Sequence, residues 1–143
     1  MKKEPTEHSE QVAVIQWCET MKNQYPALDL IFAIPNGGKR HVGTAKKLKA
    51  EGVKAGVPDL FLPVPRWVEY LERKFKAGLF IEMKIKGRKT TPNQNKWIAD
   101  LRRQGYRVEV CQGADAAIEV IKEYLGIFER GLTPNLIAIR PLN

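Results

Sequence analysis

The chain has 143 residues, of which 43% are hydrophobic and 28% are charged, a composition typical of one globular domain. Its 24 Lys and Arg outnumber its 16 Asp and Glu and give a formal charge of +8, so a polyanion is the first partner to consider. The longest apolar run, residues 30–34, is too short to cross a membrane, and two cysteines without a CxxC spacing argue against a disulfide scaffold or a structural zinc site.

The N-terminal segment is predicted to form a helix and not a signal peptide. Residues 1–5 lack the apolar core of a signal peptide, which together with the low cysteine content favours a cytoplasmic location. Over about residues 6–25, Val14 and Cys18 begin an apolar face at helical spacing. Glu10 lies one turn before Val14 and therefore projects from the edge of the same face.

A strand is predicted over residues 28–34, because every second residue from Leu28 is apolar. The sequence Pro35-Asn36-Gly37-Gly38 ends this strand with strong turn chemistry. Thr44 is the expected N-cap of a short basic helix that carries Lys46, Lys47 and Lys49.

Two short apolar runs are predicted to be the central strands. The first, residues 60–62, is opened by Asp59, and the second, residues 79–81, is interrupted by Glu82. Because side chains alternate along a strand, Glu82 and Lys84 project from one face and the apolar residues between them from the other. Buried charges are costly unless they are paired, ligate a metal or open into a cleft.

The remaining elements complete an α/β pattern. Residues 63–77 form either a short helix or a protruding hairpin. Thr91 and Gln94 have the spacing of a capping box at the start of another helix. That helix ends at Gly105 and is followed by a strand at 106–111, a helix at 115–125, and a tail at 127–143 that provides an edge strand or an oligomer contact. The order predicts an α/β domain with a mixed sheet flanked by helices.

Asp59 and Glu82 are the candidate ligands of a divalent cation. They are 23 residues apart, and on neighbouring strands both side chains could reach one point. Two carboxylates suit a hard cation such as Mg²⁺, which keeps waters that a substrate phosphate can replace. Lys84 could polarise the attacking water or stabilise charge on the phosphate. In the alternative interpretation, Asp59 belongs to a simple turn and Glu82 forms a surface pair with Lys84.

A second set of residues could contact a phosphate backbone. It combines glycines, which let backbone amides approach a phosphate, with basic side chains. The set comprises Asn36, Gly37, Gly38, Lys39, Arg40, His41, Lys46, Lys47, Lys86, Arg88 and Lys89. The alternative is a strand-ending turn and a solvated basic surface. Gln94 could serve only as a helix cap, and Glu10 could be an ordinary solvated helix residue.

The order of these motifs resembles that of the PD-(D/E)XK nucleases: Pro58-Asp59, then Glu82-x-Lys84, then a helix whose first turn contains Gln94. The surrounding segments are similar to the VRR-NUC domain (virus-type replication-repair nuclease), namely PNGGKR at 35–40, LKAEGV at 48–53, GVPDL at 56–60, LFIEMK at 79–84 and GYRV at 105–108. The similarity covers about residues 10–125.

This resemblance implies a restriction-endonuclease-like core and hydrolysis of phosphodiester bonds that depends on Mg²⁺ or Mn²⁺. The implied metal ligands are Asp59, Glu82 and the backbone carbonyl of Met83. Lys84 is the implied catalytic lysine, and Glu10 and Gln94 complete the implied site from two helices. For a stand-alone phage or bacterial domain, the resemblance further implies a homodimer that cuts branched DNA, including four-way (Holliday) junctions in DNA repair.

We therefore expect one VRR-NUC-like domain over residues 1–143, with a core at about 6–126 and a C-terminal extension at 127–143. The expected activity is that of a structure-selective, metal-dependent DNA endonuclease. A nucleic-acid-binding module of a repair or replication assembly, without catalysis, is the alternative. An enzyme that acts on RNA or on single strands is also open, because phosphate contacts do not identify the sugar.

Overall fold

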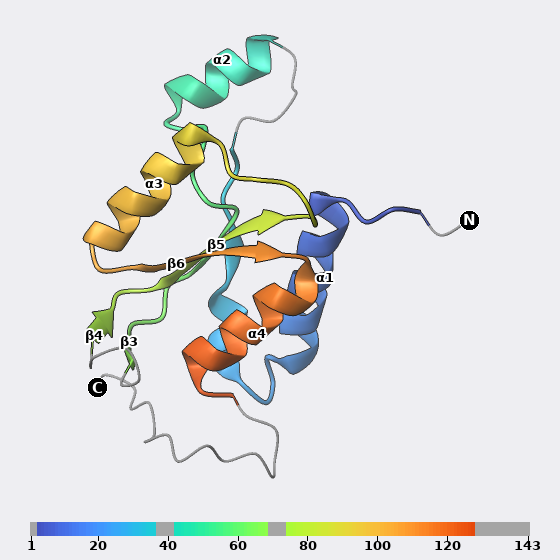
Figure 1. Cartoon of the computed structure of the whole chain (residues 1–143), viewed down its shortest axis with the longest axis vertical. Helices are drawn as coiled ribbons and strands as arrows, with labels where there is room; N and C mark the ends of the chain where they lie inside the picture. The colour runs from blue at the N-terminus through green and yellow to red at the C-terminus, as the bar shows by residue number, and fades with distance from the viewer. Residues whose placement is uncertain (1–2, 37–41, 69–73, 128–143) are drawn as a thin grey trace.

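The chain folds into a four-stranded mixed sheet with helices on both faces (Figure 1). The computed structural model describes residues 3–36, 42–68 and 74–127. The helices are α1 (Glu7–Met21), the short 3-10 helix η1 (Pro26–Leu30), α2 (Val42–Ala50), α3 (Pro92–Arg103) and α4 (Ala114–Leu125). The strands are β1 (Phe32–Ala33), β2 (Leu60–Leu62), β3 (Arg66–Val68), β4 (Lys74–Lys76), β5 (Leu79–Lys84) and β6 (Arg107–Gln112).

The main sheet has the order β1-β2-β5-β6. β1 pairs antiparallel with β2, and β2 pairs antiparallel with β5. β5 pairs parallel with β6, a connection that needs a crossover, which α3 provides. The mixed α/β sheet predicted from the sequence is therefore confirmed.

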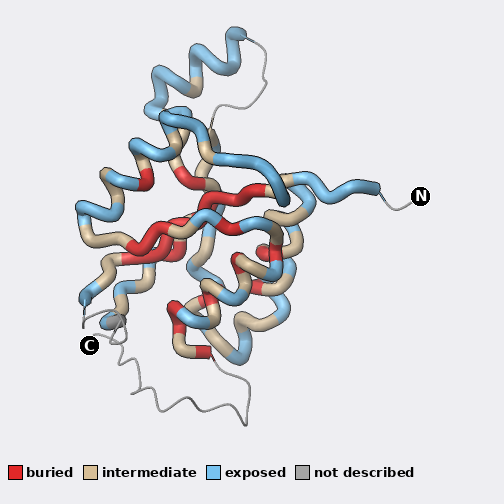
Figure 2. The backbone as a smooth tube through the Cα atoms, viewed as in Figure 1, coloured by how far each residue is buried: buried red, intermediate tan, exposed pale blue. Residues whose placement is uncertain are grey.

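β5 is the central strand, and all six of its residues are buried (Figure 2). On one face, Ile81 and Met83 belong to the main core, which α1 and α4 cover. On the other face, Phe80 packs with Ile98 of α3 and Val108 of β6. The predicted alternation along this strand is thus correct, and Glu82 lies on the α3 face, as Phe80 does.

The predicted strand at residues 28–34 is mostly wrong. Residues 26–30 form η1, and only Phe32–Ala33 pairs as a strand. Pro26 at the start of η1 favours this outcome, because proline presets the φ angle of a first helical turn. Leu28 is buried, but Leu30 is 53% exposed and Phe32 is 49% exposed, so these residues do not form one buried side.

The segment 63–77 forms a hairpin, which is one of the two predicted alternatives. β3 and β4 pair antiparallel in a separate two-stranded sheet. The Arg66 guanidinium anchors the hairpin by donating to the carbonyls of Tyr124 and Leu125 at the C-terminus of α4. A cation there also complements the negative end of the helix dipole.

Other predictions for the chain have mixed outcomes. Thr44 lies within the first turn of α2, which already begins at Val42, so it is not the N-cap of that helix. Residues 37–41 and 128–143, with the predictions made for them, lie outside the described residues. None of the helices in the described ranges combines the length and hydropathy needed to cross a bilayer.

Candidate active site

Asp59 lies where the ladder between β2 and β5 ends. Leu60 pairs with Ile81 in this antiparallel register, so Asp59 comes next to Glu82 as the strands continue. The Asp59 Oδ2 atom accepts a hydrogen bond from the backbone N–H of Met83 at 2.7 Å. The side chain therefore replaces a strand partner and is fixed against β5. Burial raises the pKa of Asp59, although this hydrogen bond and others oppose the shift.

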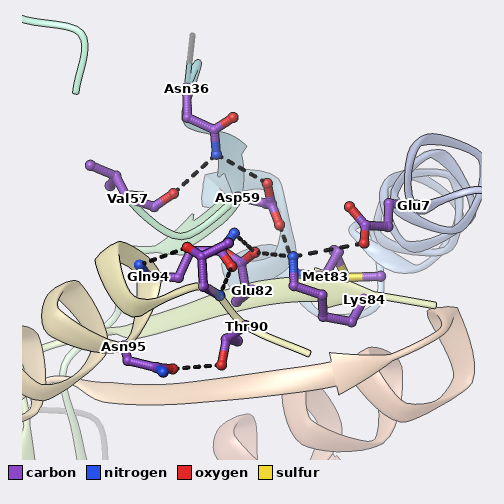
Figure 3. A network of polar contacts seen from close by, with 11 residues as sticks. Glu7, Asn36, Val57, Asp59, Glu82, Met83, Lys84, Thr90, Gln94 and Asn95 are labelled. Carbon is purple, nitrogen blue, oxygen red and sulfur yellow. Dashed lines mark hydrogen bonds and ion pairs between the residues drawn. The ribbon is translucent and has the colours of Figure 1, made fainter. Parts of the chain in front are cut away.

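Asn36 supports Asp59 from the end of β1. Its Nδ2 atom lies 3.3 Å from the Asp59 Oδ1 atom and 3.1 Å from the carbonyl oxygen of Val57. An amide NH₂ has two donor hydrogens, so one group can serve both acceptors. The sequence predicted a phosphate contact for Asn36, whereas in the structure its amide orients a candidate metal ligand (Figure 3).

Glu82 is a buried carboxylate with one occupied and one free oxygen. Glu82 is only 1% exposed. The Oε1 atom accepts from Gln94 Nε2 at 2.5 Å and lies 3.0 Å from Lys84 Nζ. Within the described ranges, the buried Oε2 atom has no hydrogen-bond donor. Burial, together with the charge of Asp59, raises the pKa of Glu82 to about 7.

Lys84 lies between two carboxylates. Its ammonium group is 3.0 Å from Glu82 Oε1 and 3.7 Å from Glu7 Oε1, and its side chain is only 8% exposed. Burial by itself lowers the pKa of Lys84. The hydrogen bond and charge of Glu82, with the charges of Glu7 and Asp59, outweigh burial and raise that pKa. Lys84 is therefore a permanent cation at neutral pH.

Gln94 has two functions that the sequence presented as alternatives. Its Oε1 atom accepts the backbone N–H of Thr91 at 2.9 Å, and the Thr91 hydroxyl accepts the Gln94 N–H, which completes the predicted capping box. Its Nε2 atom at the same time donates to Glu82 (Figure 3). One side chain thus begins α3 and fixes the carboxylate.

The resemblance implied that Glu10 completes the site, and in the structure its carboxylate caps α4. Its Oε2 atom accepts the backbone N–H of Ala114 at 2.5 Å, the first residue of α4. Gly113 precedes that helix and has no side chain with which to cap it. The α1 carboxylate that pairs with Lys84 is Glu7, one turn earlier on the same helix. Sequence spacing places Glu7 on the same face as Glu10, because it lies two turns before the buried Val14, but spacing does not distinguish the two.

The donor set fits a hard divalent cation. The described residues contain no group of three or more His, Cys, Asp and Glu side chains that could hold a metal. Asp59 and Glu82 are nevertheless adjacent, and the free Oε2 atom of Glu82 has no protein partner in the described ranges. The N–H and C=O of one strand residue face the same edge, so the Met83 carbonyl faces the Asp59 side. Two carboxylates and a carbonyl suit a cation that retains waters.

The described basic residues predicted to contact phosphate lie in two places. Lys86, Arg88 and Lys89 are exposed in the connection from β5 to α3, and Lys46 and Lys47 are exposed on α2. The other predicted contacts, from Gly37 to His41, belong to the residues that are not described.

The chain is similar to known proteins over most of its length. Residues 3–115 match the family model of the VRR-NUC domain. A solved structure named "VRR_NUC domain protein" is 33% identical, with a TM-score of 0.69, and the match covers 87% of this chain and 92% of that chain. A search of curated proteins gave no match.

Proposed function

The chain belongs to the VRR-NUC domain family, a nuclease family of the PD-(D/E)XK superfamily, and on that premise we propose that it is a metal-dependent, structure-selective DNA endonuclease. The proposed substrate is branched DNA such as a four-way (Holliday) junction. The observation that supports the proposal most strongly is the cluster of half-buried Asp59 with buried Glu82 and Lys84, in which one carboxylate oxygen is unpartnered among the described atoms. A protein that only binds phosphate gains nothing from burying acids beside it.

Asp59, Glu82 and the Met83 carbonyl would hold the cation. Mg²⁺ or Mn²⁺ bound there supplies Lewis acidity toward a water and a backbone phosphate. Asn36 and the Met83 N–H fix the orientation of Asp59 before substrate arrives. This preorganisation lowers the cost of arranging charges during the reaction.

Three other side chains prepare the site for a phosphate. Lys84 keeps its proton and presents a positive charge beside Glu82, where negative charge grows on the phosphate oxygens. Glu7 helps to keep that proton on Lys84, because its carboxylate lies 3.7 Å from the ammonium. Gln94 prevents rotation of the Glu82 carboxylate.

The direct test uses labelled duplex, flap and four-way-junction DNA with Mg²⁺, Mn²⁺ or EDTA. We expect cleavage of branched DNA only with a metal. Asp59→Ala, Glu82→Ala and Lys84→Ala should each abolish cleavage while DNA binding persists. Normal Mg²⁺-dependent cleavage by any one of them would show that its residue has no catalytic role. Binding by the wild-type chain with no cut product under any condition would favour the non-catalytic binding module.

The proposal includes a homodimer, because resolving a four-way junction needs two cuts. Phe32 on the edge strand β1 and the Trp67–Phe75 pair of the hairpin are apolar surfaces available for such a contact. Light scattering at micromolar concentration should give twice the mass of 16.3 kDa. A monomer under these conditions would contradict paired cutting.

A further inference from the structure

α2 is a helix that buries none of its residues in the described structure. Figure 2 shows it as exposed along almost its whole length, and Figure 1 shows it standing beyond the N-terminal end of α3. A helix of nine residues has little stability of its own in water. Leu48 is half-buried and the other eight residues of α2 are exposed, so most of the helix surface is available to a partner.

The end of α2 is nevertheless well defined. Gly52, at φ 98°, follows the helix, and its N–H donates to the carbonyl of Lys49 at 3.1 Å. The N–H of Val53 donates to the carbonyl of Leu48 at 2.9 Å. These two bonds form a Schellman motif, which satisfies the last carbonyls and fixes the direction in which the chain leaves the helix.

The segment after this motif is clamped to α3. The carbonyl of Ala55 accepts from Asn93 Nδ2 at 2.9 Å and from Trp97 Nε1 at 3.2 Å. Gly56 has φ 87°, and a Cβ atom there would lie 2.7 Å from Asn93 Nδ2, so only glycine permits this close approach. The Lys54 ammonium lies 5.9 Å from the Trp97 ring centroid, which adds a cation–π contact. α2 therefore projects from a fixed base.

The same turn of α3 holds the base of α2 and the candidate active site. Asn93 binds Ala55, and its neighbour Gln94 binds Glu82. The last residue of α2, Ala50, is nine residues before Asp59 and so lies at most about 30 Å from it. One turn of B-form DNA is about 34 Å long, so α2 is near enough to contact a duplex within one turn of a phosphate at Asp59.

The chemistry of α2 suits a nucleic-acid duplex. It carries Lys46, Lys47 and Lys49 and no acidic residue. The ion pair that Lys47 forms with Glu51 is 4.0 Å long and exposed, so it competes weakly with phosphate. The major groove of B-form DNA is about 12 Å wide and admits an α-helix, whereas the major groove of A-form RNA is too narrow.

We propose that α2 is a rigid arm that enters the major groove of B-form duplex DNA within one turn of the phosphate at the active site. The inference rests on the proposed nuclease function for the position of that phosphate. It assigns double-stranded DNA, in preference to double-stranded RNA, as the nucleic acid beside the cut.

The test is equilibrium binding of the full chain, in EDTA, to a DNA duplex and an RNA duplex of the same sequence. Lys46→Ala with Lys49→Ala should weaken DNA binding roughly tenfold and lower the slope of log K against log salt by about 2. The matched control, Lys76→Ala with Lys122→Ala, removes the same charge from the hairpin and α4 and should leave most of the affinity and slope intact. Alanine favours helix, so the α2 variant keeps its fold.

A second variant tests insertion into the groove separately from charge. Ala45 is exposed on α2, and Ala45→Trp adds bulk without changing charge. It should weaken binding to the DNA duplex several-fold and leave the thermal midpoint unchanged. DNA binding equal to wild type by Ala45→Trp, or equally tight binding of DNA and RNA duplexes, would overturn the proposal. Because these measurements need neither metal nor cleavage, a protein that binds through α2 yet never cuts would refute only the nuclease function.

Discussion

Gln94 and Glu82 are joined by a hydrogen bond of 2.5 Å from the amide Nε2 to the carboxylate Oε1. The other end of the same amide accepts the N–H of Thr91 at the start of α3. The beginning of a helix and the orientation of a buried acid are therefore fixed by one side chain. Loss of Gln94 should affect both stability and chemistry.

Gln94→Ala should lose about 0.5–2 kcal/mol of unfolding free energy, because it removes half of the capping box. It should also reduce cleavage by roughly 10–100-fold, as expected when a residue that orients a metal ligand is removed. Thr91→Ala is the matched control, since it damages the same cap without touching Glu82. Equal cleavage rates for the two variants would show that the amide contributes only to the helix.

Asn36→Ala should weaken metal binding, because Asp59 loses the donor at its Oδ1 atom. We expect Mn²⁺ affinity, measured by calorimetry, to fall by roughly tenfold or more. Asn95→Ala provides a control near the site, where the amide oxygen accepts from Thr90 and not from the acids. Unchanged Mn²⁺ affinity in Asn36→Ala would return this residue to the role of a phosphate contact.

We expect substitution of Glu7 to affect cleavage and substitution of Glu10 to affect stability. Glu10→Ala leaves the N–H of Ala114 without its partner and should cost about 1–3 kcal/mol of stability, with normal cleavage by the folded fraction. Glu7→Ala should leave stability nearly unchanged and slow cleavage, because Lys84 loses a neighbouring anion. Denaturant unfolding and single-turnover cleavage measure the two effects. The reverse pattern would restore the assignment that the family resemblance gave to Glu10.

The pKa of Glu82 predicts how the stability of the metal-free protein depends on pH. This pKa is raised from 4.5 to about 7, so between these values the folded state binds more protons than the unfolded state. The contribution of protonated Glu82 to the free energy of unfolding is therefore fully present below about pH 4.5. It is lost as the pH rises through about 7. In EDTA at about pH 8, Glu82→Gln should be more stable than wild type by about 1–3 kcal/mol, the gain being limited by the lost pairing with Lys84.

At about pH 4.5 that difference should disappear, since both proteins then carry a neutral group at this position. Denaturation at both pH values measures it. A wild-type protein that gains stability over Glu82→Gln as the pH rises would contradict the raised pKa.

The sequence predicted the central strands and the positions of Asp59 and Glu82 correctly, because a charged residue in an apolar strand is costly and therefore informative. Glu82 and Lys84 could be placed on one face from alternation alone, and the capping box of α3 was readable from Thr91 and Gln94. Local sequence patterns did not predict the role of a residue when that role depends on a contact with a residue far away in the chain. The partner of Asn36 is 23 residues away, so its Asn-Gly sequence indicated a turn or a phosphate contact and gave no sign of Asp59.

Helical periodicity could not choose between Glu7 and Glu10, because both lie on the side of α1 that faces the sheet and differ by one turn. Their roles depend on where α4 begins, at Ala114, more than 100 residues later in the chain. The strand predicted over residues 28–34 was also wrong because the pattern was considered without its surroundings. Its alternating pattern is that of a strand, but Pro26 and the burial of Leu28 favour a 3-10 turn.

The β3–β4 hairpin and the candidate active site lie at opposite ends of β5. Along β5, Glu82 lies about 10 Å and Lys84 about 17 Å from Leu79, where the strand begins. Arg66 attaches the hairpin to the carbonyls of Tyr124 and Leu125 at the end of α4. None of these residues belongs to the candidate active site. The length and sequence of this hairpin can therefore change without moving Asp59, Glu82 or Lys84, which leaves this end of the molecule free of the constraints on the acids.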